Sequence, residues 1–221
     1  MGFKIELKNV SFAYDKGANI LNEVNLVVHP GEVVALSVPV GGGKSTFLKV
    51  CAGILEPTSG ELIIDEKNFW QLNTIDQNYL RSCMGFDFQE AALISNMTIF
   101  GNLALSLRYQ AEIPEPKIQT TVSKWLADLQ LTAYQDQLPA ALSLGLRRRV
   151  SFIRAMLSGG NFFFWDDPSE GRTVEFEQII IKTILEKKKN GISSLITSQD
   201  KIFVEQVVDR VLCLEQGHLH S

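Results

Sequence analysis

A run of glycines followed by a lysine and two hydroxyl residues is the first group in this chain that could do chemistry. Its members are Gly41, Gly42, Gly43, Lys44, Ser45 and Thr46. The group follows the apolar run 33–36 and opens a helical pattern. In such a strand–loop–helix arrangement, backbone N–H groups and the positive end of the helix bind phosphate, a lysine neutralises the β- and γ-oxygens, and the next hydroxyl binds Mg²⁺. The spacing therefore predicts a site for ATP or GTP.

One position of this loop departs from the usual pattern. Glycine is expected where Val38 stands. Such a position often needs backbone torsion angles that valine resists, which puts the geometry of the loop in question. The alternative interpretation is a glycine turn that binds nothing, and the Lys44-Ser45 pair in this context argues against it.

Two carboxylates end a second apolar run. Residues 162–165 are three phenylalanines and a tryptophan, and Asp166 and Asp167 follow them directly. This pattern is typical of a parallel strand that is buried on both faces and has its polar residues at the carboxyl end. Asp166 would hold Mg²⁺, directly or through water, and Asp167 would orient the attacking water. The alternative is a strand that merely ends in a solvated pair of aspartates, which Lys44-Ser45 upstream disfavours.

Strands and helices must bring these two groups together. Apolar alternation and apolar runs predict strands at residues 5–10, 25–28, 33–36, 61–65, 161–165, 194–197 and 210–214. Helical patterns cover residues 44–52, 174–189 and 201–208. Residues 74–157 are mostly helical, with breaks at Gly101, at 113–116 and near Pro139.

The order of these elements predicts one domain over residues 1–221. The fold class is α/β: a P-loop NTPase core with a mixed or parallel sheet and helices, an N-terminal antiparallel β region and an inserted helical lobe. The core would comprise residues 1–73 and 158–221, and the lobe residues 74–157.

Composition and charge limit the partners. The 21 Lys and Arg against 25 Asp and Glu give a net charge of −4, which offers no general attraction to nucleic acid. Cys51, Cys83 and Cys213 have an odd count and no metal-ligand spacing, so we expect reduced thiols that fill the core of a cytosolic protein. Charges interrupt the start of the chain, and no apolar stretch reaches the roughly 20 residues of a membrane span. We expect neither a signal peptide nor a membrane helix.

Five further sequence elements occur in the order that characterises one protein family. They are Pro30-Gly31-Glu32, Pro57-Thr58-Ser59-Gly60-Glu61, Phe88-Gln89, Leu142-Ser143-Leu144-Gly145-Leu146 and Asp166-Asp167-Pro168. With the glycine loop, this series resembles the ATP-binding subunits of ABC transporters over nearly the whole chain. The ordered series is far more specific than any one of its members.

The resemblance gives roles to residues that mean little alone. Tyr14 matches the aromatic residue that stacks on adenine, with a ring that covers the core as the alternative. Gln89 would sense Mg²⁺ and the attacking water at the hinge between core and lobe. Ser143 and Gly145 would face a phosphate bound across a dimer, which is either a homodimer or a heterodimer with another ATPase subunit.

The resemblance also implies a separate membrane-spanning permease, with this chain in the cytoplasm at the inner face of the cell membrane. Residues 89–102 would form the groove that accepts a cytoplasmic helix of the permease. The apolar side chains that motivate this expectation are Leu93, Ile94, Met97 and Ile99. Packing inside the helical lobe explains the same side chains nearly as well.

Several departures from the family pattern affect catalysis rather than binding. Asp167 replaces the usual glutamate, which withdraws the carboxylate by about 1 Å. Gln199 replaces the switch histidine; its amide donates a hydrogen bond but carries no charge. Leu144 and Leu146 replace a glycine and a glutamine of the signature, and Thr173 replaces an aspartate. We therefore expect ATP binding with reduced hydrolysis, and the scatter of the changes favours natural divergence.

Within the family, residues 91–103 and Leu146-Arg147-Arg148-Arg149-Val150 resemble the Mla/Mce branch, which energises lipid movement through bacterial envelopes. Three consecutive arginines are also common on a solvated helix face. The competing functions are a non-hydrolysing ATP-dependent scaffold or regulator, a soluble ABC protein of DNA repair or translation, and a small-molecule P-loop kinase. The net charge disfavours the second, and Gln89 with the Ser143-x-Gly145 element disfavours the third.

Overall fold

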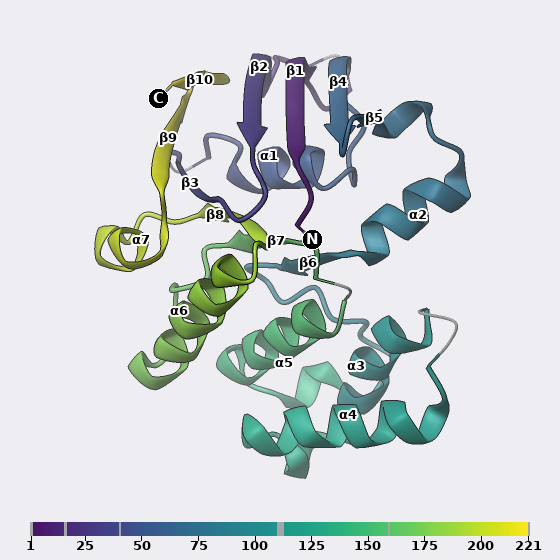
Figure 1. Cartoon of the computed structure of the whole chain (residues 1–221). Coiled ribbons are helices and arrows are strands. Elements are labelled where there is room, and N and C mark those ends of the chain that lie inside the picture. The colour runs from purple at the N-terminus through teal and green to yellow at the C-terminus, as the bar shows by residue number, and fades with distance from the viewer. Residues whose placement is uncertain (1, 16, 40, 110–112, 159, 221) are drawn as a thin grey trace.

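Two β-sheets form the framework of the chain (Figure 1). The structure is a computed structural model, and it describes residues 2–15, 17–39, 41–109, 113–158 and 160–220. The larger sheet contains β3 (Val33–Ser37), β6 (Met84–Asp87), β7 (Phe162–Asp166), β8 (Ser193–Thr197), β9 (Arg210–Glu215) and β10 (His218–His220). The smaller sheet contains β1 (Ile5–Phe12), β2 (Leu21–Val28), β4 (Ser59–Ile64) and β5 (Lys67–Asn68).

The larger sheet gathers the ends of its strands at one edge. Its order is β10-β9-β3-β8-β7-β6, and every pair from β9 to β6 is parallel. Ser37, Asp166 and Thr197, the last residues of three neighbouring strands, therefore share the carboxyl edge, where ligands of open α/β sheets bind. In the smaller sheet every described pair is antiparallel, as the sequence predicted.

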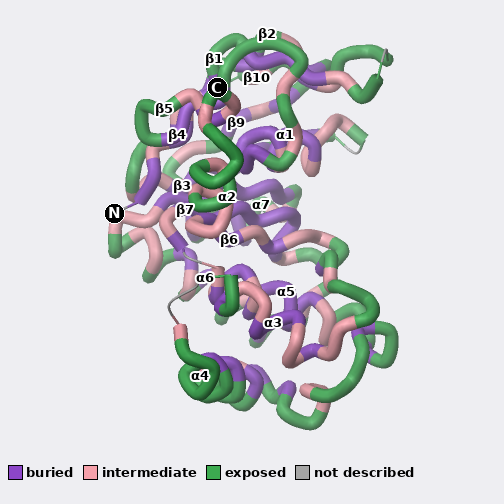
Figure 2. The backbone as a smooth tube through the Cα atoms, turned by 90° about the vertical axis from the view of Figure 1, so that its right-hand side faces the viewer, coloured by how far each residue is buried: buried purple, intermediate pink, exposed green. Residues whose placement is uncertain are grey.

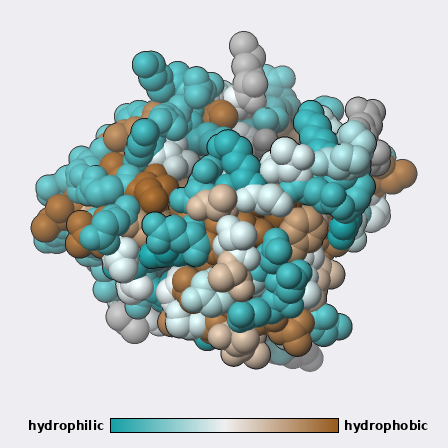
Figure 3. Space-filling model, turned by 90° about the horizontal axis from the view of Figure 1, so that it is seen from below, coloured by the Kyte–Doolittle hydropathy of each residue, from teal (hydrophilic) through white to brown (hydrophobic). Residues whose placement is uncertain are grey.

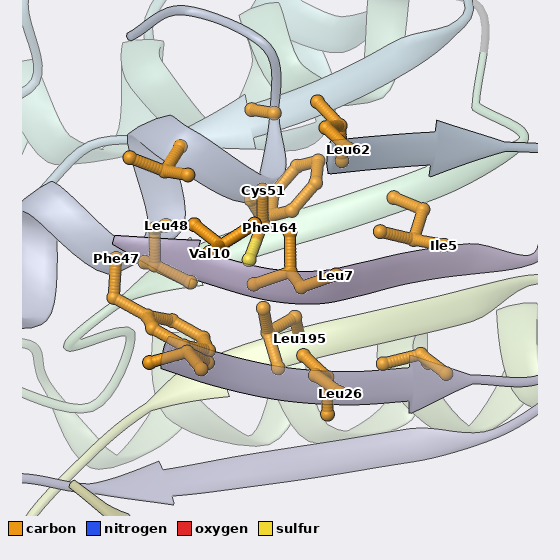
Figure 4. Packing of buried hydrophobic residues seen from close by; sticks show 14 of the residues in the cluster. Ile5, Leu7, Val10, Leu26, Phe47, Leu48, Cys51, Leu62, Phe164 and Leu195 are labelled. Carbon is orange, nitrogen blue, oxygen red and sulfur yellow. The ribbon is translucent and has the colours of Figure 1, made fainter. Parts of the chain in front are cut away.

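The first hydrophobic core lies between the two sheets, around α1 (Lys44–Cys51). Figure 4 shows Phe47, Leu48 and Cys51 of this helix among side chains of both sheets, such as Leu7 and Phe164. These five side chains are fully buried. Helix α1 is thus held by apolar burial on two sides, and its start is fixed at the carboxyl edge of β3.

The second core lies on the opposite face of the larger sheet. Strand β7 divides its side chains by the period of two: Phe162 and Phe164 enter the first core, and Phe163 and Trp165 enter the second. The helices that cover this face include α3 (Ile99–Arg108), α4 (Glu115–Asp128), α5 (Leu144–Leu157), α6 (Val174–Lys189) and α7 (Lys201–Val207). Burial on both faces explains why this strand reads as a continuous apolar run.

Helices α3, α4 and α5 form the helical lobe at the lower end of Figure 1. In Figure 2, α4 has a buried side toward α3 and α5 and an exposed side toward solvent. Figure 3 shows the underside, where apolar groups lie among hydrophilic ones instead of forming one continuous patch. The short 3₁₀ turns of the chain are η1 (Phe69–Gln71), η2 (Thr132–Tyr134) and η3 (Pro139–Ala141).

The structure corrects two details of the expected lobe. The segment 74–157 contains α2 (Thr74–Ser82) and strand β6, and β6 pairs with β7 in the core sheet. The pairing is close because residue 85 is glycine: a Cβ there would come within 2.4 Å of the Phe163 ring. Gly101 does not break a helix, since its N–H donates to the Thr98 hydroxyl that caps α3.

The predicted strands are all present, with β2 beginning at Leu21 instead of residue 25. The three cysteines are free thiols, as expected. Only Cys51 fills the core, where burial raises the pKa of its thiol, whereas Cys83 and Cys213 are partly exposed. Among the described residues, no helix is both long enough and apolar enough to cross a bilayer.

Candidate nucleotide-binding site

The glycine loop lies between the end of β3 and the start of α1. Gly41 and Gly43 have positive φ angles of 77° and 92°, which glycine adopts without strain. Gly42 is required by space, because a Cβ there would come within 2.7 Å of Val38 Cγ1. In the described part of the loop, no side chain caps α1. The N–H groups of its first turn are therefore open to an anion.

Val38 occupies the position where the pattern has glycine, and the fold accepts it. The described residues with positive φ do not include Val38, and its side chain is buried in the first core. Valine therefore replaces glycine without left-handed backbone strain, and the concern about loop geometry is removed at this position. Val40, another residue of the loop, lies outside the described residues.

Ser45 and Asp166 lie side by side at the carboxyl edge of the sheet. The Ser45 hydroxyl donates to Asp166 Oδ2 at 2.7 Å, and the Thr197 hydroxyl donates to Asp166 Oδ1 at 2.9 Å. Asp166 is the last residue of β7 and is buried. Neighbouring hydroxyl and carboxylate oxygens are the hard ligands that Mg²⁺ prefers, with further positions filled by phosphate and water. Ser45 and Asp166, two of the three residues predicted to bind metal, therefore fit the ion, whereas the amide of Gln89 donates to Glu170.

Lys44 and Asp167 form an ion pair beside this metal position. The Lys44 ammonium donates to Asp167 Oδ2, and the Asp167 N–H donates to Thr197 O at 3.0 Å. Asp167 has a left-handed backbone with φ of 49°, which points to a position under local strain. Burial raises the pKa of the Asp167 carboxyl, and the hydrogen bond and charge of Lys44 act in the opposite direction.

The predicted catalytic side chains line one pocket of about 380 Å³. Its lining includes Lys44, Gln89, Asp167 and Gln199. Gln89 Nε2 donates to Glu170 Oε2 at 2.5 Å, and Gln199 Nε2 donates to Val38 O at 3.2 Å. Four segments that are distant in sequence thus converge here, and they bring one cation, two amides and the carboxylates of Asp167, Glu170 and Asp200 around one space.

Tyr14 lies two residues beyond the end of β1, close to the start of α1. Its hydroxyl is 3.3 Å from Thr46 Oγ1, and its ring packs edge-to-face on Phe12. Half of the residue is exposed to solvent. The exposed half of the ring is accessible for stacking on a base attached to phosphates in the glycine loop, while its contact with Phe12 also covers the core.

Ser143 and Gly145 lie apart from this pocket, at the start of α5. The Ser143 hydroxyl accepts a hydrogen bond from the Leu146 N–H and caps the helix. Both residues are exposed, and a Cβ at Gly145 would meet no described atom within 4 Å. Packing within the chain therefore does not require glycine at this position. Leu144 is 47% exposed, so the same short segment presents an apolar side chain to the outside.

Several residues that support the pocket do not stand out in the sequence. Arg148 belongs to a run of three arginines for which a solvated face is the alternative interpretation, but it is only 7% exposed, and its Nε donates to Gln89 O at 3.2 Å. Thr197 fixes Asp166, and Asp87 pairs with Arg172 out of contact with solvent. Among these residues, only Asp87 could be identified from the sequence pattern. It follows the short apolar run 84–86, just as Asp166 follows the apolar run of its own strand.

Comparisons with known proteins point in one direction. Residues 21–170 match the family described as ABC transporter. The chain is 30% identical over 213 residues to the cell division ATP-binding protein FtsE of Bacillus subtilis, covering 96% of this chain and 93% of FtsE. It is 31% identical over 220 residues to the methionine import ATP-binding protein MetN of Pasteurella multocida, covering 97% of this chain and 63% of MetN.

A solved structure gives the same result for the fold. The dimeric ATP-binding cassette MJ0796, bound to ADP and Pi, superposes with a TM-score of 0.89 at 25% identity, covering 98% of this chain and 97% of that one. The α/β architecture with an antiparallel N-terminal sheet and helices is therefore confirmed.

Proposed function

The chain belongs to the ABC transporter family as an ATP-binding domain, and from this premise we propose that it couples ATP binding and slow hydrolysis to movement of a substrate through a separate permease. The observation that carries this proposal is the meeting of Lys44, Ser45 and Asp166 at the carboxyl edge of β3 and β7. These three residues supply the cation and the metal ligands that a nucleoside triphosphate requires.

In the proposed site, Ser45 and Asp166 would hold Mg²⁺, which would neutralise negative charge on the phosphates when bound. Lys44 would leave Asp167 and contact the phosphate oxygens, while the N–H groups at the start of α1 bind the same anion. Asp167 would then be free to orient a water, with Gln89 close to it in the pocket. Equilibrium titration with ATP and Mg²⁺ is the direct test, and a chain that binds no nucleotide would contradict the proposal.

We propose that two subunits close around the nucleotide. The exposed Ser143 and Gly145 of one subunit would contact a phosphate bound by the other, which agrees with the open space at Gly145. The related cassette MJ0796 is dimeric. Leu144 and Leu146 weaken this contact, and a heterodimer with an intact partner would confine that defect to one site. Sedimentation of the chain alone, with and without ATP·Mg²⁺, distinguishes homodimerisation from the need for another subunit.

A second candidate function is a scaffold or regulator that binds ATP and does not hydrolyse it. The observation that favours it is Gln199, which donates to the carbonyl of Val38 and has no charge to offer the γ-phosphate. Steady-state release of phosphate separates the two functions.

Lipid transport is the most specific part of the proposal, and it rests on residues 91–103 and 146–150. Within that second stretch, Arg148 has an internal structural role, since it is buried against Gln89 and Glu170. The named relatives include proteins of cell division and methionine import.

We propose that the chain lies at the cytoplasmic face of the membrane, and the permease bound to it would identify the substrate.

The segment 89–102 is the proposed docking surface for the permease. Ile99 is fully buried in the lobe, and Asn102 fixes the turn before it by accepting from Ile94 N–H at 2.7 Å and donating to Met97 O at 3.0 Å. Ile94 is 39% exposed on this turn, and Leu93 and Met97 are partly exposed, so apolar side chains remain there for contact with a partner.

We expect a photocrosslinker at Ile94 or Asn96 to capture a polytopic membrane protein in cells, because both positions lie on the exposed turn. A crosslinker at Lys8, which is exposed on β1, is the matched control and should capture none. Capture from Lys8 with none from Ile94 would show that the permease docks on the β-rich side instead.

A further inference from the structure

An ion pair hidden from solvent joins two segments whose neighbouring residues line the proposed catalytic pocket. Asp87 is the last residue of β6, and its carboxylate accepts a hydrogen bond from Arg172 Nη2 at 2.5 Å. The side chains of Asp87 and Arg172 are 0% and 2% exposed. Arg172 also places its guanidinium 5.1 Å from the centre of the Phe176 ring. A buried pair of this kind carries a desolvation penalty, so its benefit must be sought in the geometry that it enforces.

The pair connects the two segments that carry the catalytic side chains. Asp87 precedes Gln89 by two residues, and Arg172 follows Asp167 by five. Each segment also contacts Arg148 of α5, which donates to Gln89 O at 3.2 Å and to Glu170 O. Gln89 Nε2 in turn donates to Glu170 Oε2. The loop after Asp167 is therefore attached to the segment before Gln89 at several points.

The surroundings leave this connection little freedom. A Cβ at Gly171 would come within 2.4 Å of Arg148 Nη1, so the loop approaches Arg148 as closely as glycine allows. Arg154 of α5 donates to Ala91 O and Ala92 O, and its positive charge acts on Asp87. In the described part of the chain, Asp87 Oδ1 and Arg172 Nη1 make no hydrogen bond. Close packing against Arg148 and the nearby positive charge of Arg154 thus restrict the movement of the pair.

We propose that Asp87 and Arg172 are positioning residues that keep the side chains of Asp167 and Gln89 correctly placed relative to each other for the attack of water. The inference rests on the proposed ATPase site, because the relative position of Asp167 and Gln89 affects catalysis only if they act on ATP. The pair touches neither the phosphates nor the metal position, so it acts through the two segments. A misplacement of about 1 Å at a catalytic group is enough to slow a reaction many-fold, which gives a rigid connection its value.

Hydrogen exchange on the full chain tests the connection without nucleotide. We expect Asp87→Asn and Arg172→Gln each to raise amide exchange about fivefold in both segments, 88–92 and 168–173, and the double variant to add nothing further, because either change removes the same contact. Lys188→Gln, which breaks the partly exposed 2.6 Å pair with Asp209, is the matched control and should leave both segments unchanged. Faster exchange confined to the substituted segment would overturn the proposal.

Turnover gives the second readout. Each single variant should lower kcat about fivefold and leave the Kd for ATP within twofold, and Arg172→Lys, which keeps the charge, should recover part of the loss. If either single variant does not fold, Arg172→Lys alone carries the exchange test. A parent that binds no ATP would refute the proposed function. The exchange result would still show whether the ion pair links segments 88–92 and 168–173. A parent that hydrolyses ATP, with variants of unchanged kcat, would overturn the positioning role.

Discussion

Replacing Lys44 with alanine is expected to weaken ATP binding by about 10- to 150-fold. The Lys44 ammonium lies at the start of α1 and contacts Asp167, so it is already positioned beside the metal-binding residues. Hydrogen bonds between a charged donor and a charged acceptor contribute about 1.5 to 3 kcal/mol, and each 1.4 kcal/mol changes affinity about tenfold. The Asp167 carboxylate would also lose its counter-charge and repel the phosphates.

Titration calorimetry with ATP and Mg²⁺ measures this loss. Lys49→Ala is the matched control, because Lys49 lies in the last turn of the same helix and should leave affinity unchanged. The double variant Lys44→Ala, Asp167→Asn should recover part of the affinity, since it removes the unpaired carboxylate. Equal affinity of Lys44→Ala and the parent would mean that phosphate does not bind at this loop.

The sequence predicted the arrangement of the phosphate site because its parts are local. The glycine loop joins a strand to the helix that follows it, so Lys44 and Ser45 are placed by their own neighbours along the chain. Asp166 could be placed as well, because residues that end parallel strands of one sheet must share an edge. These two rules place Ser45 and Asp166 at the same edge, and the strand order, with β8 between β3 and β7, sets their 2.7 Å contact.

Other features depended on contacts that no local pattern encodes. Strand β6 has four residues, too few for a periodic signal, and it is defined by pairing with β7. Arg148 stands in a run of three arginines, which are also common on a solvated face, and it is buried by contacts with Gln89 and with the loop after Asp167. The apolar residues of 89–102 divide between lobe and surface through the hydrogen bonds of Asn102. The sequence supported packing inside the lobe nearly as well as a docking groove for that segment.

Restoring two side chains of the family pattern is expected to raise ATP turnover roughly tenfold or more. Asp167 keeps the negative charge that orients water, but its reach is shorter than that of glutamate by about one methylene, on the order of 1 Å. Gln199 faces the same pocket and supplies only a neutral donor. Asp167→Glu with Gln199→His would correct both the distance and the charge, and tenfold corresponds to about 1.4 kcal/mol of activation barrier.

Steady-state phosphate release at saturating ATP compares the parent, each single variant and the double variant, with the permease captured through Ile94 present. We expect the largest gain in the double variant, because the water and the γ-phosphate must both be positioned in one transition state. A parent that already turns over at about 1 to 10 s⁻¹, the range of ordinary enzymes, would refute slow hydrolysis. If the double variant gains nothing, the defect lies in the signature. Leu144 and Leu146 replace a glycine and a glutamine there, and Leu144 is exposed at the start of α5.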